Sequence, residues 1–430
     1  MSSDSQLPKI QELDRALAQI AGQIRILVPL QWPASAEDEF LAAFRAGRPE
    51  LPKVKLTPRP VGGDLEALAN VQKQCDRAHP IGNLVYKTAR SYESAVRMLA
   101  GIGTPAFTEY SAQLYGLPTD RYRTQKVTPL TAADFFLTTT DRLLGGKQLP
   151  ELVADIPSKE FGERVQKKLD RFFVEDRVEV VLDPDLASKA VGGSTRIRVR
   201  EGARFSTLDL AQLVNHEAYV HSATILNGKR QKNLLCLGLG SPRTTRTQEG
   251  LAVLAELLTM SIDVMRLRRV ALRVRAIQDA LEGADFIEVF KGFLEAGQSE
   301  EESFKSAQRV FRGGDVRGKV VFTKDSVYLK GLLEVHTFVK VAIRDNRPEL
   351  VRALFAGRMT LGDVVELAPY FESGWLQGPA YVPPWAEDPR RLVAVLAYSA
   401  FINEVNMSEV GLQHFPAFEE RAATGSVRQS

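Results

Sequence analysis

The sequence predicts an α+β fold that is predominantly helical and holds a small sheet near the middle of the chain. Apolar residues recur at helical spacing along most of the sequence, as Ile10, Leu13 and Leu17 do near its start. The period-two alternation typical of strands is concentrated at 178–182 and 195–200. With 430 residues, of which 44% are hydrophobic and 25% charged, the chain can bury a large core without covalent cross-links.

The first part of the chain predicts helices interrupted by a proline-rich stretch. Periodicity indicates a helix over 8–28, and the prolines that follow are expected to break regular structure: Pro29, Pro33, Pro49, Pro52, Pro58 and Pro60. We expect an N-terminal helical segment and Pro-rich linker at 1–60, a main domain at 61–420 and a disordered tail at 421–430. Further helices are expected near 64–76, 84–100, 105–115 and 159–173.

Turn and capping residues predict the elements of the middle section. The strand at 195–200 has one basic and one apolar face, so it is expected to be an edge strand. Ser206 is expected to cap a helix that ends at Asn227-Gly228. One long helix is then expected from about 246 to 282, with Thr245 and Gln248 at capping-box spacing. The segment 322–329 opens another helix.

Charge and cysteine content exclude several classes of protein. The 56 basic and 53 acidic residues nearly balance, so we expect neither nucleic acid nor a membrane surface as a partner. No window approaches the roughly 20 apolar residues of a membrane span, and no signal peptide is visible. Two cysteines, Cys75 and Cys236, fit a reducing compartment. A cytoplasmic protein is expected.

Two of the five histidines lie close together on one expected helix. They are His216 and His221, and Glu217 follows the first. Neutral imidazole is a good zinc ligand, and a catalytic zinc needs three protein ligands and an open position for water. A carboxylate such as Glu217 can take the proton of that water. The segment therefore indicates a Zn²⁺ site of the pattern His-Glu-x-x-x-His, HExxxH, and the alternative is that His216 and His221 are unrelated surface or core histidines.

The spacing of the two histidines carries a structural requirement. Residues i and i+5 of a regular α-helix point about 140° apart, so both reach one ion only if the helix is locally widened, as in a π-bulge. Glu249, in the first turn of the next helix, is the candidate third ligand. Gly250 beside it would allow another backbone or the substrate to come close. Glu256 could orient a ligand histidine, or be an ordinary ion-paired residue.

A second ligand set remains open on the residues alone. Glu217 and His221 are i and i+4 and share a helix face without any widening. With Glu249 they would form a site of two carboxylates and one histidine, and His216 would lie outside it. Such a site would suit iron or manganese better than zinc.

With these motifs in hand, the sequence resembles the QEGLA-motif family. The resemblance rests on His216 to His221, on Gln248-Glu249-Gly250-Leu251-Ala252, and on three further stretches at 111–116, 311–314 and 322–329, so it covers roughly residues 80–340. Bacterial members are often labelled flavohemoglobin expression-modulating proteins, and animal relatives include the microtubule-associated tyrosine carboxypeptidase, a zinc enzyme that removes the C-terminal tyrosine of α-tubulin.

The resemblance implies a fold, a reaction and roles for particular residues. The implied fold is a zincin-like, gluzincin-type metallopeptidase domain with a small sheet beside the active-site helix. The implied zinc ligands are His216, His221 and Glu249, with Glu217 as the catalytic base. Peptide-bond hydrolysis near a protein or peptide C-terminus is then the expected activity. Tubulin is not predicted as the substrate, because the chain has no visible basic extension for microtubules.

A carboxypeptidase must also hold the terminal carboxylate of its substrate, for which arginine is the best-suited side chain. The candidates are Arg243, Arg246, Arg312 and Lys324. Each could equally form a structural ion pair. Tyr328 or Tyr219 could donate a hydrogen bond to the oxyanion. Two other functions remain open: a regulatory protein whose metal is structural or absent, and a hydrolase of a non-peptide amide or ester.

Overall fold

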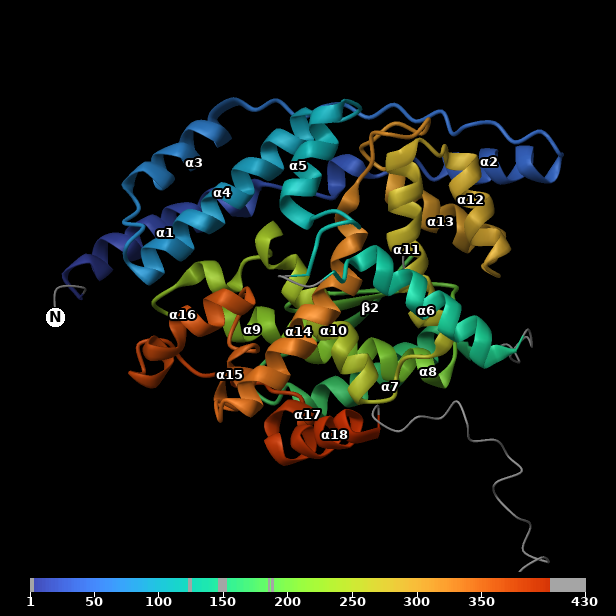
Figure 1. The fold of residues 1–430 in the computed structure, drawn as a ribbon. Coiled ribbons are helices and arrows are strands. Elements are labelled where there is room, and N and C mark those ends of the chain that lie inside the picture. The colour runs from blue at the N-terminus through green and yellow to red at the C-terminus, as the bar shows by residue number, and fades with distance from the viewer. Residues whose placement is uncertain (1–3, 123–125, 146–152, 185, 187–188, 403–430) are drawn as a thin grey trace, which may run out of the picture. The chain divides into compact units, whose positions relative to one another are not determined.

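The computed structural model describes residues 4–122, 126–145, 153–184, 186 and 189–402, and these divide between two compact units (Figure 1). The first unit is Met1–Glu387 and the second is Asp388–Ser430. Within the described residues the second unit contains the helix α18, Pro389–Ile402. The expected tail at 421–430 lies outside the described residues, and the expected boundary at residue 60 stays a prediction.

The first unit is predominantly helical from its start, as the sequence predicts. Its first helices are α1 (Leu7–Gln23), α2 (Ser35–Arg45), α3 (Gly62–Gln74), α4 (Pro80–Ala100), α5 (Pro105–Tyr115) and α6 (Pro129–Leu144), with the short 3-10 turns η1 (Asp4–Gln6) and η2 (Val28–Leu30). Helices α1, α3 and α4 lie side by side (Figure 1). None of the helices in the described part of the chain is long and apolar enough to cross a membrane. Asp14 of α1 is buried, and its carboxylate accepts the backbone N–H groups of Leu235 and Cys236.

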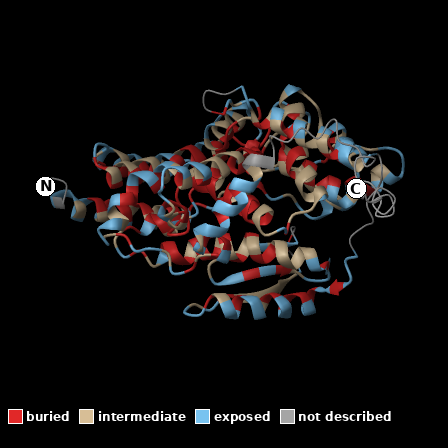
Figure 2. Cartoon of the chain, turned by 60° about the horizontal axis from the view of Figure 1, so that its bottom comes forward, coloured by how far each residue is buried: buried red, intermediate tan, exposed pale blue. Residues whose placement is uncertain are grey.

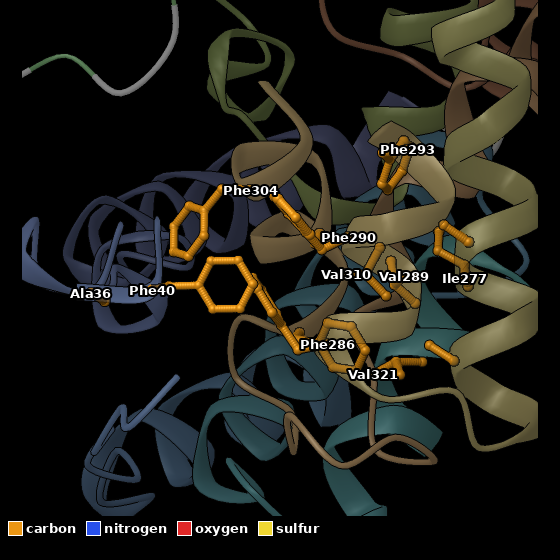
Figure 3. Packing of buried hydrophobic residues seen from close by; sticks show 14 of the residues in the cluster. Ala36, Phe40, Ile277, Phe286, Val289, Phe290, Phe293, Phe304, Val310 and Val321 are labelled. Carbon is orange, nitrogen blue, oxygen red and sulfur yellow. The ribbon is translucent and has the colours of Figure 1, made fainter. Parts of the chain in front are cut away.

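Helix α2 corrects the expectation that the proline-rich stretch lacks regular structure. Its apolar face packs into a cluster of phenylalanines, where Phe40 lies 5.0 Å from Phe286 and 4.9 Å from Phe290 between ring centroids (Figure 3). The other buried members are apolar residues of α11, α12 and α13, together with Val321 from the segment before η6. Pro33 precedes the helix, where a proline does no harm. Proline spacing therefore located the breaks but missed the helix between them.

The middle section forms two small sheets. The strands are β1 (Ile156–Pro157), β2 (Glu179–Asp183), β3 (Ala190–Gly192), β4 (Arg196–Arg200) and β5 (Arg204–Phe205), with α7 (Ser158–Phe172) after β1. Strand β1 pairs with β5, and the other three are ordered β2-β4-β3. Strand β4 is parallel to β2 and antiparallel to β3.

The expectation that residues 195–200 form an edge strand is wrong, because β4 is the central strand. Ile197 and Val199 are fully buried beside α7, whereas Arg196 and Arg198 face outward. The alternation of apolar and basic residues predicts which face of the sheet is exposed to solvent, but it does not predict which strands pair on either side. Strand β3, which the turn signal at Gly192-Gly193 concealed, forms the edge instead.

The helix that carries the two histidines has three parts: α8 (Thr207–Leu213), the π-helix η3 (Val214–Ser222) and α9 (Ala223–Lys229). Ser206 caps α8 with a capping box to Asp209, as expected at that end. The other end lies one residue from the expected position, because α9 ends at Lys229, just past Asn227-Gly228. The Asn227 amide is buried and donates to the carbonyls of Phe355 and Tyr381, both at 2.8 Å, so it anchors the helix rather than ending it.

The expected single helix at 246–282 is two helices, α10 (Thr245–Leu258) and α11 (Val264–Glu282), which follow the short turns η4 (Leu235–Gly238) and η5 (Pro242–Thr244). The break contains Met260 at φ 52°, and Asp263 caps the second helix. The predicted capping pair was also wrong. Thr244 is the N-cap residue, and Gln248 instead accepts a hydrogen bond from Thr224 at 2.7 Å.

The remaining elements of the first unit are α12 (Phe286–Glu295), α13 (Glu300–Phe311), η6 (Thr323–Ser326), α14 (Val327–Arg344), α15 (Glu349–Ala353), α16 (Leu361–Glu372) and α17 (Pro384–Glu387). Figure 2 shows individual helices with buried residues on one side and exposed residues on the other. Helices α10 and α14 touch at their backbones, because a Cβ added to Gly250 would lie 2.2 Å from the carbonyl carbon of Gly331. The expected close approach at Gly250 is therefore made by α14.

Candidate metal centre

The π-helix brings the two histidines to the same place. Hydrogen bonding of the π type through Val214–Ser222 widens the turn between His216 and His221, which confirms the local widening that their spacing requires. Their ring centroids are 4.9 Å apart. Glu249, near the start of α10, faces both rings, and its Oε2 lies 3.6 Å from each Nε2.

These three side chains lie close enough together to hold one metal ion. One ligand atom from each lies within 4.8 Å of the others, and the set is two imidazoles and a carboxylate. A separation of 3.6 Å is too long for a hydrogen bond. It is close to the roughly 3.4 Å expected between two ligands that each lie about 2.1 Å from one tetrahedral ion. The arrangement therefore favours the two-histidine ligand set over the one that excludes His216.

Glu256 orients one of the two histidines. Its Oε1 lies 2.6 Å from Nδ1 of His216, and it also accepts from Nη2 of Arg266 at 3.1 Å. The carboxyl is fully buried, and although burial raises its pKa, the charge of Arg266 and the bond to His216 lower the pKa of Glu256 to about 2. An ionised acceptor at Nδ1 leaves Nε2 of His216 free for a metal. Nδ1 of His221 has no hydrogen-bond partner among the described residues.

The three carboxylates around His216 strongly stabilise a positive charge at this position. Burial lowers the pKa of His216, but its interactions with Glu249 and Glu256 and the charge of Glu217 outweigh burial and raise this pKa to about 10. Either a proton or a metal ion can supply this charge, and the two compete for Nε2. The electrostatics of the cluster thus favour a bound cation.

Glu217 lies beside the cluster and is held by the edge strand. Its Oε2 accepts the backbone N–H of Gly192 at 2.7 Å, and its Oε1 lies 4.0 Å from Nε2 of His216. A Cβ at Gly192 would lie 2.8 Å from that Oε2, so the close approach requires glycine. The carboxylate is therefore positioned near the ligand nitrogens without being one of the three clustered ligands.

A buried cationic group adjoins Glu249 on its other side. Nζ of Lys324 lies 3.4 Å from Oε1 of Glu249 and 5.4 Å from the ring centre of Tyr328. Arg309 donates to both oxygens of Asp325, at 2.5 and 2.8 Å, and Nε of Arg273 lies 3.6 Å from the same carboxylate. These residues around Glu249 come from η6, α14, α13 and α11, and the family-like stretch at 322–329 supplies Lys324, Asp325 and Tyr328.

Of the other three cationic candidates for substrate binding, Arg312 lies near Lys324, whereas Arg243 and Arg246 form structural ion pairs. Arg312 lies 5.2 Å from the ring centre of Phe322 and has an unpartnered Nε among the described residues. Arg243 instead donates to the buried Asp363 at 2.7 Å, and Arg246 pairs with Glu334 at 3.4 Å. Tyr219 packs against Phe172, with ring centroids 4.2 Å apart, in the core behind the π-helix.

Sequence reasoning missed three groups that adjoin the metal cluster. Gly192 holds Glu217, Arg266 holds Glu256, and the charges of Glu249 and Glu217 act on Arg358. The pair Gly192-Gly193 was visible as a turn signal only. Arg266 and Arg358 carry no local signal, because their proximity to the site depends on how α11 and the segment after α15 pack.

The fold and the site together define a mainly helical protein in which two histidines and a glutamate that could hold a metal ion lie beside a small sheet. The family model of the microtubule-associated tyrosine carboxypeptidase matches residues 38–404, so this chain belongs to that family, consistent with its resemblance to the QEGLA-motif proteins. The family is one of carboxypeptidases. No curated protein matches the chain.

Proposed function

We propose that this protein is a zinc-dependent carboxypeptidase that hydrolyses a peptide bond near the C-terminus of a peptide or protein. The observation that carries the proposal is the convergence of His216, His221 and Glu249 on one point, with Glu217 next to it. Bound zinc would lower the pKa of water to about 7 and polarise the scissile carbonyl. The proposed fold is zincin-like, and the sheet β2-β4-β3 beside the π-helix supports it.

The chain's own residues then have separate tasks. Glu217 takes the proton of the attacking water and passes it to the leaving amine, and the N–H of Gly192 keeps its carboxylate in place. Glu256 keeps Nε2 of His216 available for the metal. Tyr328, which lies over Lys324 near Glu249, is the proposed hydrogen-bond donor to the oxyanion.

Among the cationic candidates, the geometry favours Arg312 and Lys324 as substrate ligands. Lys324 is also paired with an acidic residue, but that residue is Glu249 of the candidate site, and Arg312 has no ion-pair partner in the described part of the chain. Arg243 and Arg246 are each engaged by an acidic residue. The name of the family makes a C-terminal tyrosine the first residue to test. Tubulin is not part of the proposal.

A metal assay and a peptide screen test the function together. The purified protein is analysed for bound metal and incubated with pentapeptides that differ in their C-terminal residue. The expected result is one zinc per chain and release of single C-terminal amino acids, with both lost in a His216→Ala/His221→Ala variant. Absence of metal and of turnover would indicate a regulatory protein instead, and turnover limited to ester or non-peptide amide probes would point to a different hydrolase.

A further inference from the structure

One arginine that no motif includes lies at the edge of the candidate site. Arg358 is in the segment between α15 and α16. Its backbone N–H donates to the carbonyl of Leu237 at 2.7 Å. The preceding residue, Gly357, packs so closely that an added Cβ would lie 2.8 Å from Cβ of Leu237. The backbone of Arg358 is therefore fixed against η4, which leaves the side chain as the part that can respond to a ligand.

The guanidinium of Arg358 has no committed partner. It forms neither a hydrogen bond nor an ion pair with any described residue, and its Nε is buried and unpartnered. Its Nη1 lies against the exposed loop residue Gly240, where an added Cβ would be 2.8 Å away. The guanidinium thus lies at the boundary between the protein interior and an exposed loop, with its hydrogen-bond donors unused.

The acidic charges that act on Arg358 belong to the candidate site. The acidic side chains whose charges act on it are Glu249 and Glu217, and Tyr92 of α4 is its other electrostatic neighbour. Glu249 is the proposed metal ligand and Glu217 the proposed base, so neither is available as a dedicated counter-ion. A part-buried guanidinium left without one is costly, and it is suited to bind a carboxylate in a bidentate manner.

Arginines of similar burial elsewhere in this unit provide a comparison. Arg266 is paired with Glu256, Arg309 with Asp325 and Arg243 with Asp363. Arg312 also lacks such a pair, but the charges that act on it most strongly are those of Arg309, Asp325 and two tyrosines rather than those of Glu249 and Glu217. Arg358 alone of these combines a free guanidinium with the charges of both groups.

We propose that Arg358 binds the terminal carboxylate of the peptide substrate and so makes the enzyme act at the C-terminus. This inference rests on the proposed peptidase function and deepens it. The carboxylate would occupy the unused N–H groups of Arg358, and the scissile carbonyl would then lie toward Glu217 and the metal cluster. Specificity for the chain end would come from a residue outside every recognisable motif.

The test measures hydrolysis and binding of a pentapeptide ending in tyrosine, and of the same peptide with a C-terminal amide. The variants are Arg358→Gln, Arg358→Lys and Gly240→Ala, whose methyl group would displace the guanidinium without removing its charge. Arg352→Gln, which removes a surface partner of Glu387, is the matched control. Dissociation constants are measured in a Glu217→Gln background, so that binding is read without turnover.

The expected result is a roughly 10- to 100-fold rise in KM and Kd for the free-acid peptide in Arg358→Gln, with smaller rises in the other two variants. The KM and Kd of the amidated peptide should not change in Arg358→Gln. The Arg352→Gln control should keep the parent KM and Kd for both peptides. Unchanged Kd for the free acid in Arg358→Gln would overturn the assignment, as would a fall in kcat alone, which indicates an oxyanion-stabilising role. If the parent protein neither binds nor cleaves any peptide, the proposed function itself fails.

Discussion

At the scale of single residues, environment assigns different tasks to chemically identical side chains. Glu217, Glu249 and Glu256 lie around one histidine, yet each has a distinct partner: a backbone N–H, a lysine and an arginine. The sequence singled out Glu217 and Glu249 through their motifs, and it left open whether Glu256 orients a histidine or forms an ordinary ion pair. It could not predict the partners, which come from β3, η6 and α11.

Replacing Glu217 by Gln should abolish turnover and leave the metal in place. The amide is nearly the same size but cannot accept a proton, so we expect kcat to fall by roughly 10²- to 10⁴-fold. Zinc content, measured by elemental analysis, should stay at the parent level. Glu366→Gln, at an exposed pair with Lys87, is the control. Parent-like turnover in Glu217→Gln would remove this residue from the mechanism.

Replacing Glu256 by Gln should instead weaken the metal site. Loss of the charge that fixes Nδ1 of His216 is expected to lower zinc affinity roughly 10- to 100-fold. Competition with a chromogenic chelator would measure the change, and activity should return when excess zinc is supplied. An unaltered zinc affinity would show that Glu256 acts only as the ion-pair partner of Arg266.

At the scale of elements, the sequence predicted helices better than the breaks between them, and strands better than their lateral neighbours. Ser206 acts as the cap that its type predicts, because capping is a local interaction. The break after Leu258 was missed, since periodicity continues on both sides of it and the reversal at Met260 depends on a positive φ that no glycine marks. The central place of β4 was missed because lateral pairing is not encoded in one strand's alternation.

The crossing of α10 and α14 predicts a strong response to one methyl group. In Gly250→Ala the new Cβ would meet backbone atoms of Gly331, which cannot move aside as a flexible side chain could. We expect the free energy of unfolding to fall by about 1–3 kcal/mol or more, measured by urea denaturation. Gly292→Ala in α12 has open space around it and should be neutral or stabilising by up to about 1 kcal/mol. Equal effects of the two substitutions would contradict the close crossing.

At the scale of the first unit, a buried ion network ties three separate elements together. Asp325 in η6 is 2% exposed and is paired with Arg309 of α13 and, more distantly, Arg273 of α11. No sequence pattern shows this network, because its members are far apart along the chain. Its position next to Lys324 connects the stability of the fold to the candidate site.

This network predicts a specific sensitivity to acid. Burial raises the pKa of Asp325, but the charges of Arg309 and Arg273 outweigh burial and hold this pKa below its usual value. The folded-state pKa is thus lower than the unfolded one, so the stabilisation is complete above about pH 4 and is lost as the pH falls below that. Asp325→Asn should lower the free energy of unfolding at pH 7 by about 3–5 kcal/mol. Between pH 7 and pH 3 the free energy of unfolding, measured by denaturation, should fall less in Asp325→Asn than in the parent protein. An equal fall in the two proteins would show that Asp325 does not cause the acid sensitivity.

The contact made by Asp14 bears on N-terminal truncation of the protein. Its carboxylate binds the backbone at Leu235 and Cys236, and η4 in turn receives the N–H of Arg358 through Leu237. A fragment that starts at residue 61 would lack this clamp, although it would retain every recognisable motif. The two backbone N–H groups of Leu235 and Cys236 would then lose their carboxylate acceptor and depend on solvent. An expression fragment chosen by its motifs alone would therefore lack Asp14, which binds the η4 segment that contacts Arg358.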